Sequence, residues 1–478
     1  MNEDWIENEF QSADLGDQRL NRRLSLLLDR FAKFPESTIN QACESWAETK
    51  AAYRFFKNDD IAYREITRSH IEATKKRCKD FSTIIAIQDT TYFNYSDHPE
   101  TKGLCPLSKN KGKHKDEIVT LGLIMHSTLA VNTDGLPLGV LDQKIHSRSE
   151  PSKEKKELKK KTHNNALPIE EKDSYRWLEA LKNYSNEFDA KSLKVVTICD
   201  READIYDFFC LADQLHCSVV IRANQNRKIN KSSPCSEITG EELWSFVQRT
   251  KCQGNIKVII PEQKDRPARV ASCQIKFTEI TLTLPRSHTL KSMEKKTTLP
   301  MYAIFVSEKK YPPTIEPIEW MLFTNIPIKN IDQAIEKIQW YCLRWKIEVW
   351  HKIIKSGLKV EDCRLSTSDR LIRYLAIMSI VAWRIFWITV VARVIPDAPC
   401  FLFLNETEWK ILFSKMNRNM KIPKRPPTVK QSVIWIAQLG GFLARKGDKE
   451  PGISYIWRGL KKFSNILEGA EIGMDICG

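Results

Sequence analysis

Short runs of apolar and β-branched residues alternate with a helical pattern between residues 81 and 200, and this alternation restricts the fold more than any other feature. The runs are STIIAIQDTTYFNY, TLGLIMHSTLAV, LGVLDQKI and KSLKVVTICD, each with the length and composition of a strand. Before the fourth run, YRWLEALKNYSNEF has the apolar spacing of a helix. Strands that come first and then alternate with helices predict an α/β core.

Other patterns flank this core. The first sixty or so residues are predicted to be helical, because Leu20, Leu24 and Phe31 recur at helical intervals and WAETKAAYRFFKNDD forms a second amphipathic stretch. Strand-like runs with Pro-rich and basic turns predict a separate β-rich unit at about 224–317. Helical patterning returns at Ile331 and continues through IDQAIEKIQWYCLRWKIEVWHKIIKSG. The charge-dense segment HSRSEPSKEKKELKKKTHNNALPIEEKD predicts a mobile loop.

Basic residues are prominent in the N-terminal helices and in the chain as a whole. Arg19, Arg22, Arg23 and Arg30 lie in the first helical stretch, and such a module is a candidate for DNA binding, although helices of this kind are more often simply solvated on one face. The chain has 75 Lys and Arg residues against 60 Asp and Glu, a formal net charge of +15. This surplus favours a polyanionic partner, either nucleic acid or an anionic membrane surface, but a soluble basic protein without such a partner is also common.

The compartment is predicted from three further features. The apolar stretch from Leu371 to Ile395 is interrupted by three arginines, which favours a buried helix over a membrane span. The N-terminal residues MNEDWIENEF contain no apolar signal core, which argues against secretion. Thirteen cysteines include no CxxC pair and no cluster with zinc spacing, so we expect free thiols in a reducing cytoplasm.

Two aspartates end predicted strands: Asp89 in IIAIQDTTYF and Asp200 in VVTICDREAD. Open α/β sheets present their chemistry at strand ends, where a rigid element holds the side chain and the loop stays open to a ligand. Carboxylates are suitable ligands for Mg²⁺, and paired metal ions can stabilise both oxygens of a displacement at phosphate. The alternative is that each aspartate is a helix cap or a turn residue, and for either one alone this is the safer interpretation.

A polar stripe follows on the predicted helix after Ile331. Its members recur at intervals of three, four and seven, which places them on one side of a helix. A carboxylate surrounded by cations could bind a metal beside phosphate contacts, and it could equally be a solvated face with ion pairs. The spacing leaves both interpretations open for Tyr341, Arg344, Glu348, His351, Lys352 and Lys355.

Several unlinked motifs occur together in an order that resembles a known family. They are DTT at Asp89 to Thr91, DREAD at Asp200 to Asp204, WMLFT at Trp320 to Thr324, and YxxRxxxExxxxxxK from Tyr341 to Lys355. The chain resembles the Tn5-type cut-and-paste bacterial transposases, within the IS-four group of DDE enzymes with a ribonuclease-H-like core. LGDQRLNRRL and AAYRFFKN resemble the N-terminal end-binding region of that family, and LARKGDKEPGISYIWRGLKKF resembles its C-terminal dimerisation region.

The resemblance implies an α/β fold with a ribonuclease-H-like mixed sheet flanked by helices, a β-rich insertion, and helical N- and C-terminal domains. The implied domains are a DNA-end-binding domain at 1–65, a catalytic domain at 66–390 that the insertion at about 224–317 interrupts, and a dimerisation domain at 391–478. The insertion accounts for the 148 residues (348 minus 200) between Asp200 and Glu348.

The resemblance also implies roles for individual residues. Asp89, Asp200 and Glu348 would be the catalytic, metal-binding triad, whereas Glu202, Asp204 and Asp207 are predicted to be helix-start acids that the helix dipole favours. Trp320 would stack on a flipped base, unless it is simply a core residue of its strand. Asn224 stands where a lysine is expected in the prototype of the family. The other implied DNA contacts are Tyr341, Arg344, Lys355, Lys352, Arg222, Lys228, Arg19 and Arg23.

The implied function is a DNA transposase that acts as a homodimer on double-stranded transposon ends and target DNA in the bacterial cytoplasm, associated with the nucleoid when bound. The implied cofactor is Mg²⁺, with Mn²⁺ able to substitute, and the implied steps are nicking, hairpin formation, hairpin opening and strand transfer. Two alternatives stay open: a metal-dependent endonuclease that cuts without joining, and a non-catalytic DNA-binding inhibitor of transposition.

Overall fold

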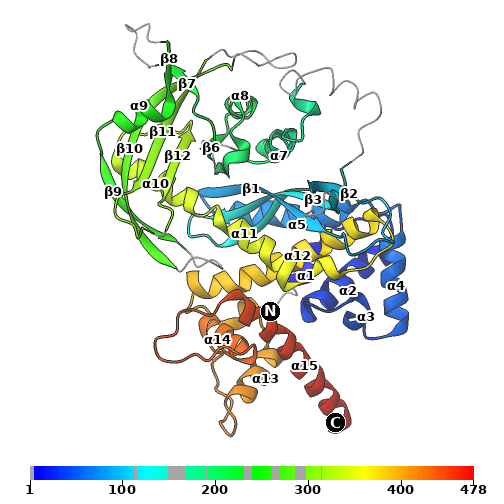
Figure 1. The fold of residues 1–478 in the computed structure, drawn as a ribbon. Helices are drawn as coiled ribbons and strands as arrows, with labels where there is room; N and C mark the ends of the chain where they lie inside the picture. The colour runs from blue at the N-terminus through cyan, green and yellow to red at the C-terminus, as the bar shows by residue number, and fades with distance from the viewer. Residues whose placement is uncertain are drawn as a thin grey trace. The chain divides into compact units, whose positions relative to one another are not determined.

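The computed structural model describes residues 5–111, 117–148, 168–189, 192–230, 239–260, 268–285, 298–313 and 315–477 (Figure 1). The chain forms two compact units. Unit 1 comprises residues 1–80, 90–149 and 346–478, and unit 2 comprises 81–89 and 150–345. Most of the segment predicted to be a mobile loop, residues 149–167, lies outside the described residues.

Unit 1 begins with five helices, which confirms the helical prediction for the N-terminal region. The side chain of Asp17 caps the second helix by accepting from the Arg19 amide, and Ser45 caps the fourth in the same way from Glu48. The apolar side of the second helix, which includes Leu24 and Phe31, is buried. The helices are α1 Trp5–Phe10, α2 Gln18–Lys33, α3 Ile39–Ala42, α4 Trp46–Lys57 and α5 Tyr63–Cys78.

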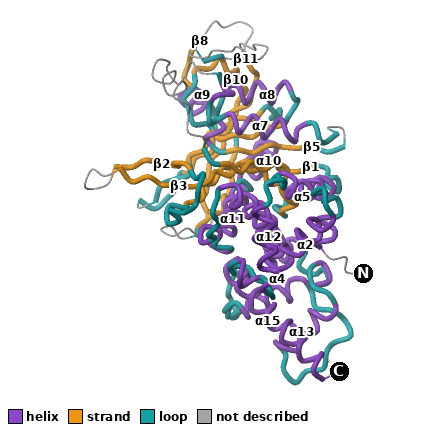
Figure 2. Tube along the Cα trace, turned by 90° about the vertical axis from the view of Figure 1, so that its right-hand side faces the viewer, coloured by secondary structure: helices purple, strands orange, loops and turns teal. Residues whose placement is uncertain are grey.

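The strands of unit 1 are antiparallel. β3 (Glu117–Asn132) pairs with β2 (Cys105–Lys111) and with β4 (Pro137–His146). β2 and β3 run side by side as a long pair of strands in Figure 2. Helix α5 packs against β4. Strand β1 (Thr83–Asn94) begins in unit 2, and its residues 90–94 belong to unit 1.

Helix α12 (Ser368–Val394) is the central helix of unit 1. It is the one helix of the described residues that is long and apolar enough to cross a membrane, but 89% of its most apolar window is buried inside the protein, as the sequence predicted. Its Arg373 donates to the backbone oxygens of Phe56 and Ile61, so the buried charge is used to hold the end of α4. After α12 come the short 3₁₀ turn η6 (Cys400–Leu402) and helices α13 Glu406–Met416, α14 Val429–Leu439 and α15 Ile453–Cys477.

Unit 2 contains a mixed sheet. Residues 83–87 of β1 pair in parallel with β5 (Lys194–Cys199), which pairs in parallel with β6 (Ser218–Arg222). The order then continues with antiparallel strands, from β12 through β11 and β10 to β7 and β8, with β9 also paired to β10. The bounds are β7 Lys228–Asn230, β8 Thr239–Glu242, β9 Gly254–Ile260, β10 Arg269–Thr283, β11 Thr298–Glu308 and β12 Glu319–Thr324.

Helices cover this sheet. α7 and α8 lie together beside the parallel strands, and α10 packs against β6 and β9 (Figure 1). The predicted β-rich segment also contains a helix, α9, because Leu243 and Val247 on one side of it are buried against β10 and β11. A large mixed sheet with helices confirms the α/β class. The bounds are η2 Ile169–Glu171, α7 Tyr175–Ser185, η3 Arg201–Ala203, α8 Tyr206–Gln214, α9 Leu243–Arg249 and α10 Ile331–Cys342.

The continuous helix predicted after Ile331 is wrong in one respect. α10 ends at Cys342, a turn follows at 343–344, and α11 (Trp345–Lys352) begins a new helix. The backbone then continues into a π-helical turn, η4 (Ile353–Gly357), and a 3₁₀ turn, η5 (Val360–Asp362). The division between the two units falls at the same place, between residues 345 and 346. The polar stripe is therefore divided among α10, the turn at 343–344, α11 and η4.

Candidate active site and nucleic-acid interface

Asp89 and Asp200 come from neighbouring parallel strands of unit 2. The register pairs Ile87 of β1 with Ile198 of β5, so each aspartate lies two residues beyond this pair at the same edge of the parallel pairing. The carboxyl ends of parallel strands meet at one edge, which is where the sequence predicted a site. The two aspartates therefore lie toward the same end of this parallel strand pair.

The prediction that Asp89 ends its strand is wrong. β1 continues to Asn94, because the residues after Asp89 enter unit 1, where Phe93 is completely buried. Asp200 does follow the last residue of β5, and its Oδ1 accepts a hydrogen bond of 2.9 Å from the Glu202 amide. Asp200 is therefore a cap, as the alternative interpretation held. Capping uses Oδ1 and leaves Oδ2 for another role.

Cationic and aromatic side chains of unit 2 gather near these aspartates. An Arg344 guanidinium nitrogen lies 4.0 Å from Oδ2 of Asp89. The Tyr341 side chain is buried, and its ring meets that of Trp320 edge-on at 5.3 Å between centroids. Burial raises the pKa of Tyr341, whereas the charges of Arg344 and Arg222 lower it. Unit 2 therefore brings four of the predicted residues, Asp89, Arg222, Tyr341 and Arg344, into one electrostatic environment with Asp200, and Trp320 joins them through its contact with Tyr341.

Arg222 belongs to the same group. Burial lowers its pKa, while a hydrogen bond with Tyr341 acts in the opposite direction. Its guanidinium also donates to the backbone oxygen of Glu319, next to Trp320, at 3.2 Å. Trp320 is half-buried on β12, so it is not the fully buried core residue of the alternative interpretation. These contacts hold an arginine, a tyrosine and a tryptophan together at the end of β6 and the start of β12.

The rest of the polar stripe lies in unit 1. Glu348 is half-buried on α11, and Lys352 is exposed at the end of that helix. Burial lowers the pKa of Lys355, although Glu361 raises it, and the Lys355 ammonium lies 5.6 Å from the centre of the Phe93 ring. His351 does not belong to a solvated face, one of the two interpretations that the spacing left open, because its side chain is only 6% exposed and packs beside Trp350.

The donor set fits a hard divalent cation in its chemistry, since carboxylate oxygens held on strands and helices are ligands that Mg²⁺ accepts. Within the part of the chain that the structure describes, no three His, Cys, Asp or Glu side chains are gathered closely enough to hold a metal ion. The cysteines of the described residues are free thiols, as predicted. Metal binding by Asp89, Asp200 and Glu348 stays a prediction.

The acidic residues after Asp200 have roles that the sequence prediction described only in part. Asp207 does lie in the first turn of α8. Asp204 instead pairs with Arg227 at 2.7 Å and accepts from the amides of Asn224 and Gln225, so it holds the loop that follows β6. The backbone of Asn224, which stands in place of the expected lysine, is therefore tied to Asp204. Lys228, at the start of β7, is exposed.

The DNA contacts predicted from the sequence do not include an exposed face of α4. Trp46 is 78% exposed, and four further residues follow it at helical intervals. The spacing of i, i+4, i+7, i+8 and i+11 was visible in the sequence and could have identified one side of a helix. Arg19 is exposed at the start of α2, whereas Arg23 is half-buried. The α4 face consists of Trp46, Lys50, Tyr53, Arg54 and Lys57.

Comparison with known families adds two matches. A family model described as Transposase DNA-binding matches residues 2–61, and one described as Transposase Tn5 dimerisation domain matches residues 380–476. The chain belongs to the Tn5-type transposases. The first match covers α1 to α4, and the second runs from the middle of α12 to α15. The matches support DNA and a second copy of the chain as partners of this Tn5-type transposase.

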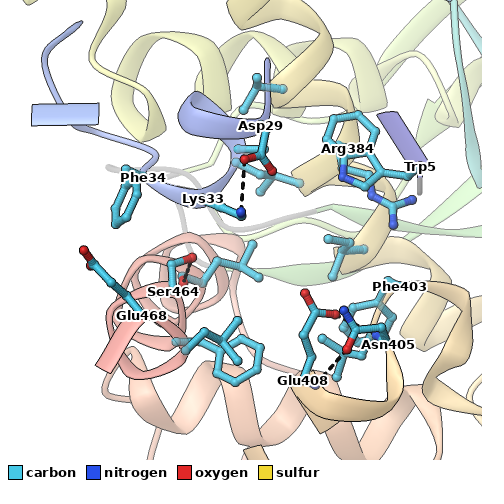
Figure 3. Close-up of a pocket in the computed structure, with 18 of the residues that line it drawn as sticks. Trp5, Asp29, Lys33, Phe34, Arg384, Phe403, Asn405, Glu408, Ser464 and Glu468 are labelled. Atoms are coloured by element: carbon cyan, nitrogen blue, oxygen red, sulfur yellow. Dashed lines mark hydrogen bonds and ion pairs between the residues drawn. The ribbon is translucent and has the colours of Figure 1, made fainter. Parts of the chain in front are cut away.

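Both matched segments of this transposase contribute to a pocket of about 460 Å³ in unit 1. Figure 3 shows α2 residues, among them Lys33, on one side and Ser464 and Glu468 of α15 opposite. Arg384 of α12 lies 5.2 Å from the ring of Trp5 at the edge of the pocket. The pocket places the DNA-binding match and the dimerisation match on facing walls.

Proposed function

We propose that this Tn5-type transposase cuts DNA at the ends of a transposable element and joins the released ends to target DNA by metal-dependent phosphoryl transfer. One observation carries the proposal: the residues of four separate family motifs, Asp89, Asp200, Trp320, and Tyr341 with Arg344, share one electrostatic and aromatic cluster in unit 2. In the linear sequence they are spread from residue 89 to residue 344. Motifs that matched the family by chance would not be expected to lie together in the fold.

Each side chain has a role that its chemistry supports. Asp89, Asp200 and Glu348 would hold Mg²⁺ or Mn²⁺, which when bound supplies Lewis-acid stabilisation of charge on phosphate oxygens. Arg344 and Arg222 are planar donors suited to a phosphate, and Tyr341 can donate one hydrogen bond beside them. Lys352 and Lys355 would contact the phosphates that follow along the same strand. The half-buried ring of Trp320 offers an edge and a face for an extruded base.

The reaction consists of successive displacements at phosphorus. Water attacks the phosphate at an element end, and the 3′-hydroxyl that leaves then attacks the opposite strand to form a hairpin. A second water opens the hairpin, and the new 3′-hydroxyl attacks a phosphate of the target. Oxygen nucleophiles and oxygen leaving groups alternate in all of these steps, so one set of side chains can serve them without a covalent protein intermediate.

Recognition of the ends is assigned to the N-terminal helices. The α4 face combines two aromatic residues with three cations, a composition that suits contact with base edges and phosphates. Arg19 and Arg23 on α2 would add phosphate contacts. We assign the reaction to the bacterial cytoplasm, on nucleoid DNA, with two copies of the chain pairing two ends.

The test uses linear DNA that carries the sequences flanking the gene, with purified protein and Mg²⁺. Wild type should release the element through hairpin intermediates and give joined products, while Asp200→Asn and Glu348→Gln should bind the ends without cutting them. Glu202→Gln is the matched control, because Glu202 is an exposed carboxylate two residues from Asp200 that pairs with Arg176. It should cut like wild type.

The other outcomes identify the alternatives. Nicks or double-strand breaks without joined products would favour an endonuclease. Binding without any cleavage by wild type would favour a non-catalytic inhibitor of transposition. Cleavage that survives in Asp200→Asn would overturn the assignment of the site.

A further inference from the structure

A chain of neutral hydrogen bonds lies beneath the two aspartates in the core of unit 2. Gln88 Nε2 donates to the Tyr184 hydroxyl at 3.1 Å, and the Tyr184 and Thr197 hydroxyls are 2.7 Å apart. Gln88 is 0% exposed, and Tyr184 and Thr197 are each 1% exposed. Helix α7 supplies the tyrosine, β1 the glutamine and β5 the threonine. The network therefore joins three elements.

The position of the network relates it to the site. Gln88 directly precedes Asp89, and Thr197 lies three residues before Asp200. Thr197 pairs with Ala86, so Thr197, Ala86 and Gln88 face the same side of the parallel strands, while Asp89 faces the other side. The residues just before each aspartate, Gln88 and Cys199, are both completely buried. Both aspartates are thus held from behind.

Stability alone does not account for these polar groups. Gln88 Oε1 is buried and has no hydrogen-bond partner among the described residues, so it has lost its water without gaining a bond in return, which lowers stability. The neighbouring residues Ile87, Ile198 and Cys199 are fully buried, and apolar side chains would fill this site without that cost. What hydrogen bonds add in an apolar core is direction and a single register.

Register matters here because a slip of one residue between β1 and β5 would turn one aspartate to the opposite face of the sheet. Apolar residues tolerate small sliding movements, whereas a tyrosine hydroxyl that bonds to both strands allows one alignment only. We propose that Tyr184 is a positioning residue that locks β1 against β5 and so sets the separation of the Asp89 and Asp200 carboxylates. This inference rests on the proposed function, in which those carboxylates bind a metal ion.

Tyr184→Phe tests the inference, since it removes one oxygen and keeps the ring. Binding of Mn²⁺ to the protein alone, followed through the electron paramagnetic resonance signal of free Mn²⁺, should weaken about tenfold, the lower end of the effect of residues that orient metal ligands. The Mg²⁺ concentration for half-maximal end cleavage should rise in parallel. Binding of end DNA without metal should stay unchanged.

Tyr374→Phe is the matched control. Tyr374 is also buried, and its hydroxyl hydrogen-bonds with Cys363 in unit 1, away from the aspartates in the chain. It should lower stability without changing Mn²⁺ affinity. Where Tyr184→Phe is too unstable to study, the double variant Tyr184→Phe, Thr197→Val takes its place. It removes both hydroxyls of the 2.7 Å bond, so the Thr197 hydroxyl is not left without its partner. The double variant should be more stable than Tyr184→Phe and should still bind Mn²⁺ more weakly than wild type.

The failure of the inference differs from the failure of the proposed function. Wild type that binds Mn²⁺ and cuts DNA, beside Tyr184→Phe with the same Mn²⁺ affinity and Mg²⁺ dependence, overturns the positioning role alone. Wild type that neither binds Mn²⁺ nor cuts overturns both. A lower melting temperature as the sole effect of Tyr184→Phe means that the tyrosine is purely structural, and this also overturns the inference.

Discussion

The network at Tyr184 in unit 2 has a charged counterpart in unit 1. There Arg77 of α5 donates to both carboxylate oxygens of Glu9 on α1, at 2.8 and 2.9 Å, and to the Leu138 backbone oxygen at 2.6 Å. His70 contacts Glu9 through Nδ1, and its Nε2 accepts from the Val140 amide at 3.1 Å. The neutral network is buried, as are Glu9 and His70 of the charged one, whereas Arg77 is half-buried; each network joins three elements. Only the one at Glu9 carries formal charge.

The difference teaches that buried polar groups can serve two purposes. The charged network ties α1, which lies in the DNA-binding match, to α5 and β4 of the same unit. Its loss leaves a bare charge in the interior, so it acts as an anchor with a large penalty for breakage. The neutral network costs less to break and is suited to alignment. The charged network therefore anchors a helix, whereas the neutral network aligns two strands.

Protonation distinguishes the two networks as well. Burial raises the pKa of Glu9, but His70 and Arg77 together lower it more, and the result is a pKa of about 2. Burial lowers the pKa of His70, against the effect of Glu9. A neutral His70 agrees with its geometry, because Nε2 must be unprotonated to accept from the Val140 amide. The Tyr184 network contains no group that titrates in the acid range.

The largest expected effect comes from Arg77→Met. This change keeps much of the side-chain volume and leaves Glu9 buried without its main partner, so the free energy of unfolding should fall by about 3 to 5 kcal/mol. Urea denaturation followed by circular dichroism measures it. Adding Glu9→Leu removes the stranded carboxylate and should recover most of the loss. A double variant as unstable as Arg77→Met would show that packing against Trp383, 4.4 Å from the guanidinium, is what matters.

The next effect is the dependence of stability on pH. The pKa of Glu9 falls from 4.5 to about 2 on folding, so its contribution is complete above pH 4.5 and is lost as the pH falls toward 2. Wild type should exceed Glu9→Gln in free energy of unfolding at pH 6, and the gap should narrow steadily at pH 4 and pH 3. A constant gap would mean that Glu9 is not held ionised in this way.

A smaller effect is expected for the stability of Tyr184→Phe. The variant strands the Gln88 amide and the Thr197 hydroxyl, which should lower the free energy of unfolding by about 1 to 2 kcal/mol. The difference from wild type should be the same at pH 6 and pH 3, in contrast to Glu9→Gln. Parallel urea titrations at the two pH values decide the matter. A loss that grows or shrinks with pH would link this network to a titrating group and weaken the comparison.

The smallest effect on stability belongs to the exposed α4 face. Lys50→Ala should change the free energy of unfolding by no more than about 0.5 kcal/mol, because Lys50 is solvated. Its effect should appear in DNA binding, where loss of one phosphate contact lowers the slope of log affinity against log salt by about 1. Lys79→Ala, exposed at the end of α5 and outside the DNA-binding match, is the control and should leave the slope unchanged. Equal slopes for wild type and Lys50→Ala would remove α4 from the interface.

The amino-acid pattern by itself determined the α/β class, the N-terminal helices, the long buried helix and the strands that carry the two aspartates. These features are encoded within stretches of ten or so residues, through apolar periodicity and caps such as Ser45. The family motifs likewise pointed to Asp89, Asp200 and Glu348, and these assignments stay predictions until the metal and cleavage experiments are done. Periodicity could not reveal the break after Cys342 or the burial of His351, since both depend on what packs against the helix.

Tertiary structure alone decided which polar groups meet. Glu9 and Arg77 are 68 residues apart, and Gln88 and Tyr184 are 96 apart, so no local pattern marks them as partners. Gly139 shows the same dependence: its φ is 141°, and a Cβ added there would lie 1.9 Å from Thr74 Oγ1, because α5 approaches β4 closely. Local sequence selects helix or strand through short-range sterics and burial. Partnership inside the core is settled by packing, because a buried polar group must find its partner wherever the fold has brought one.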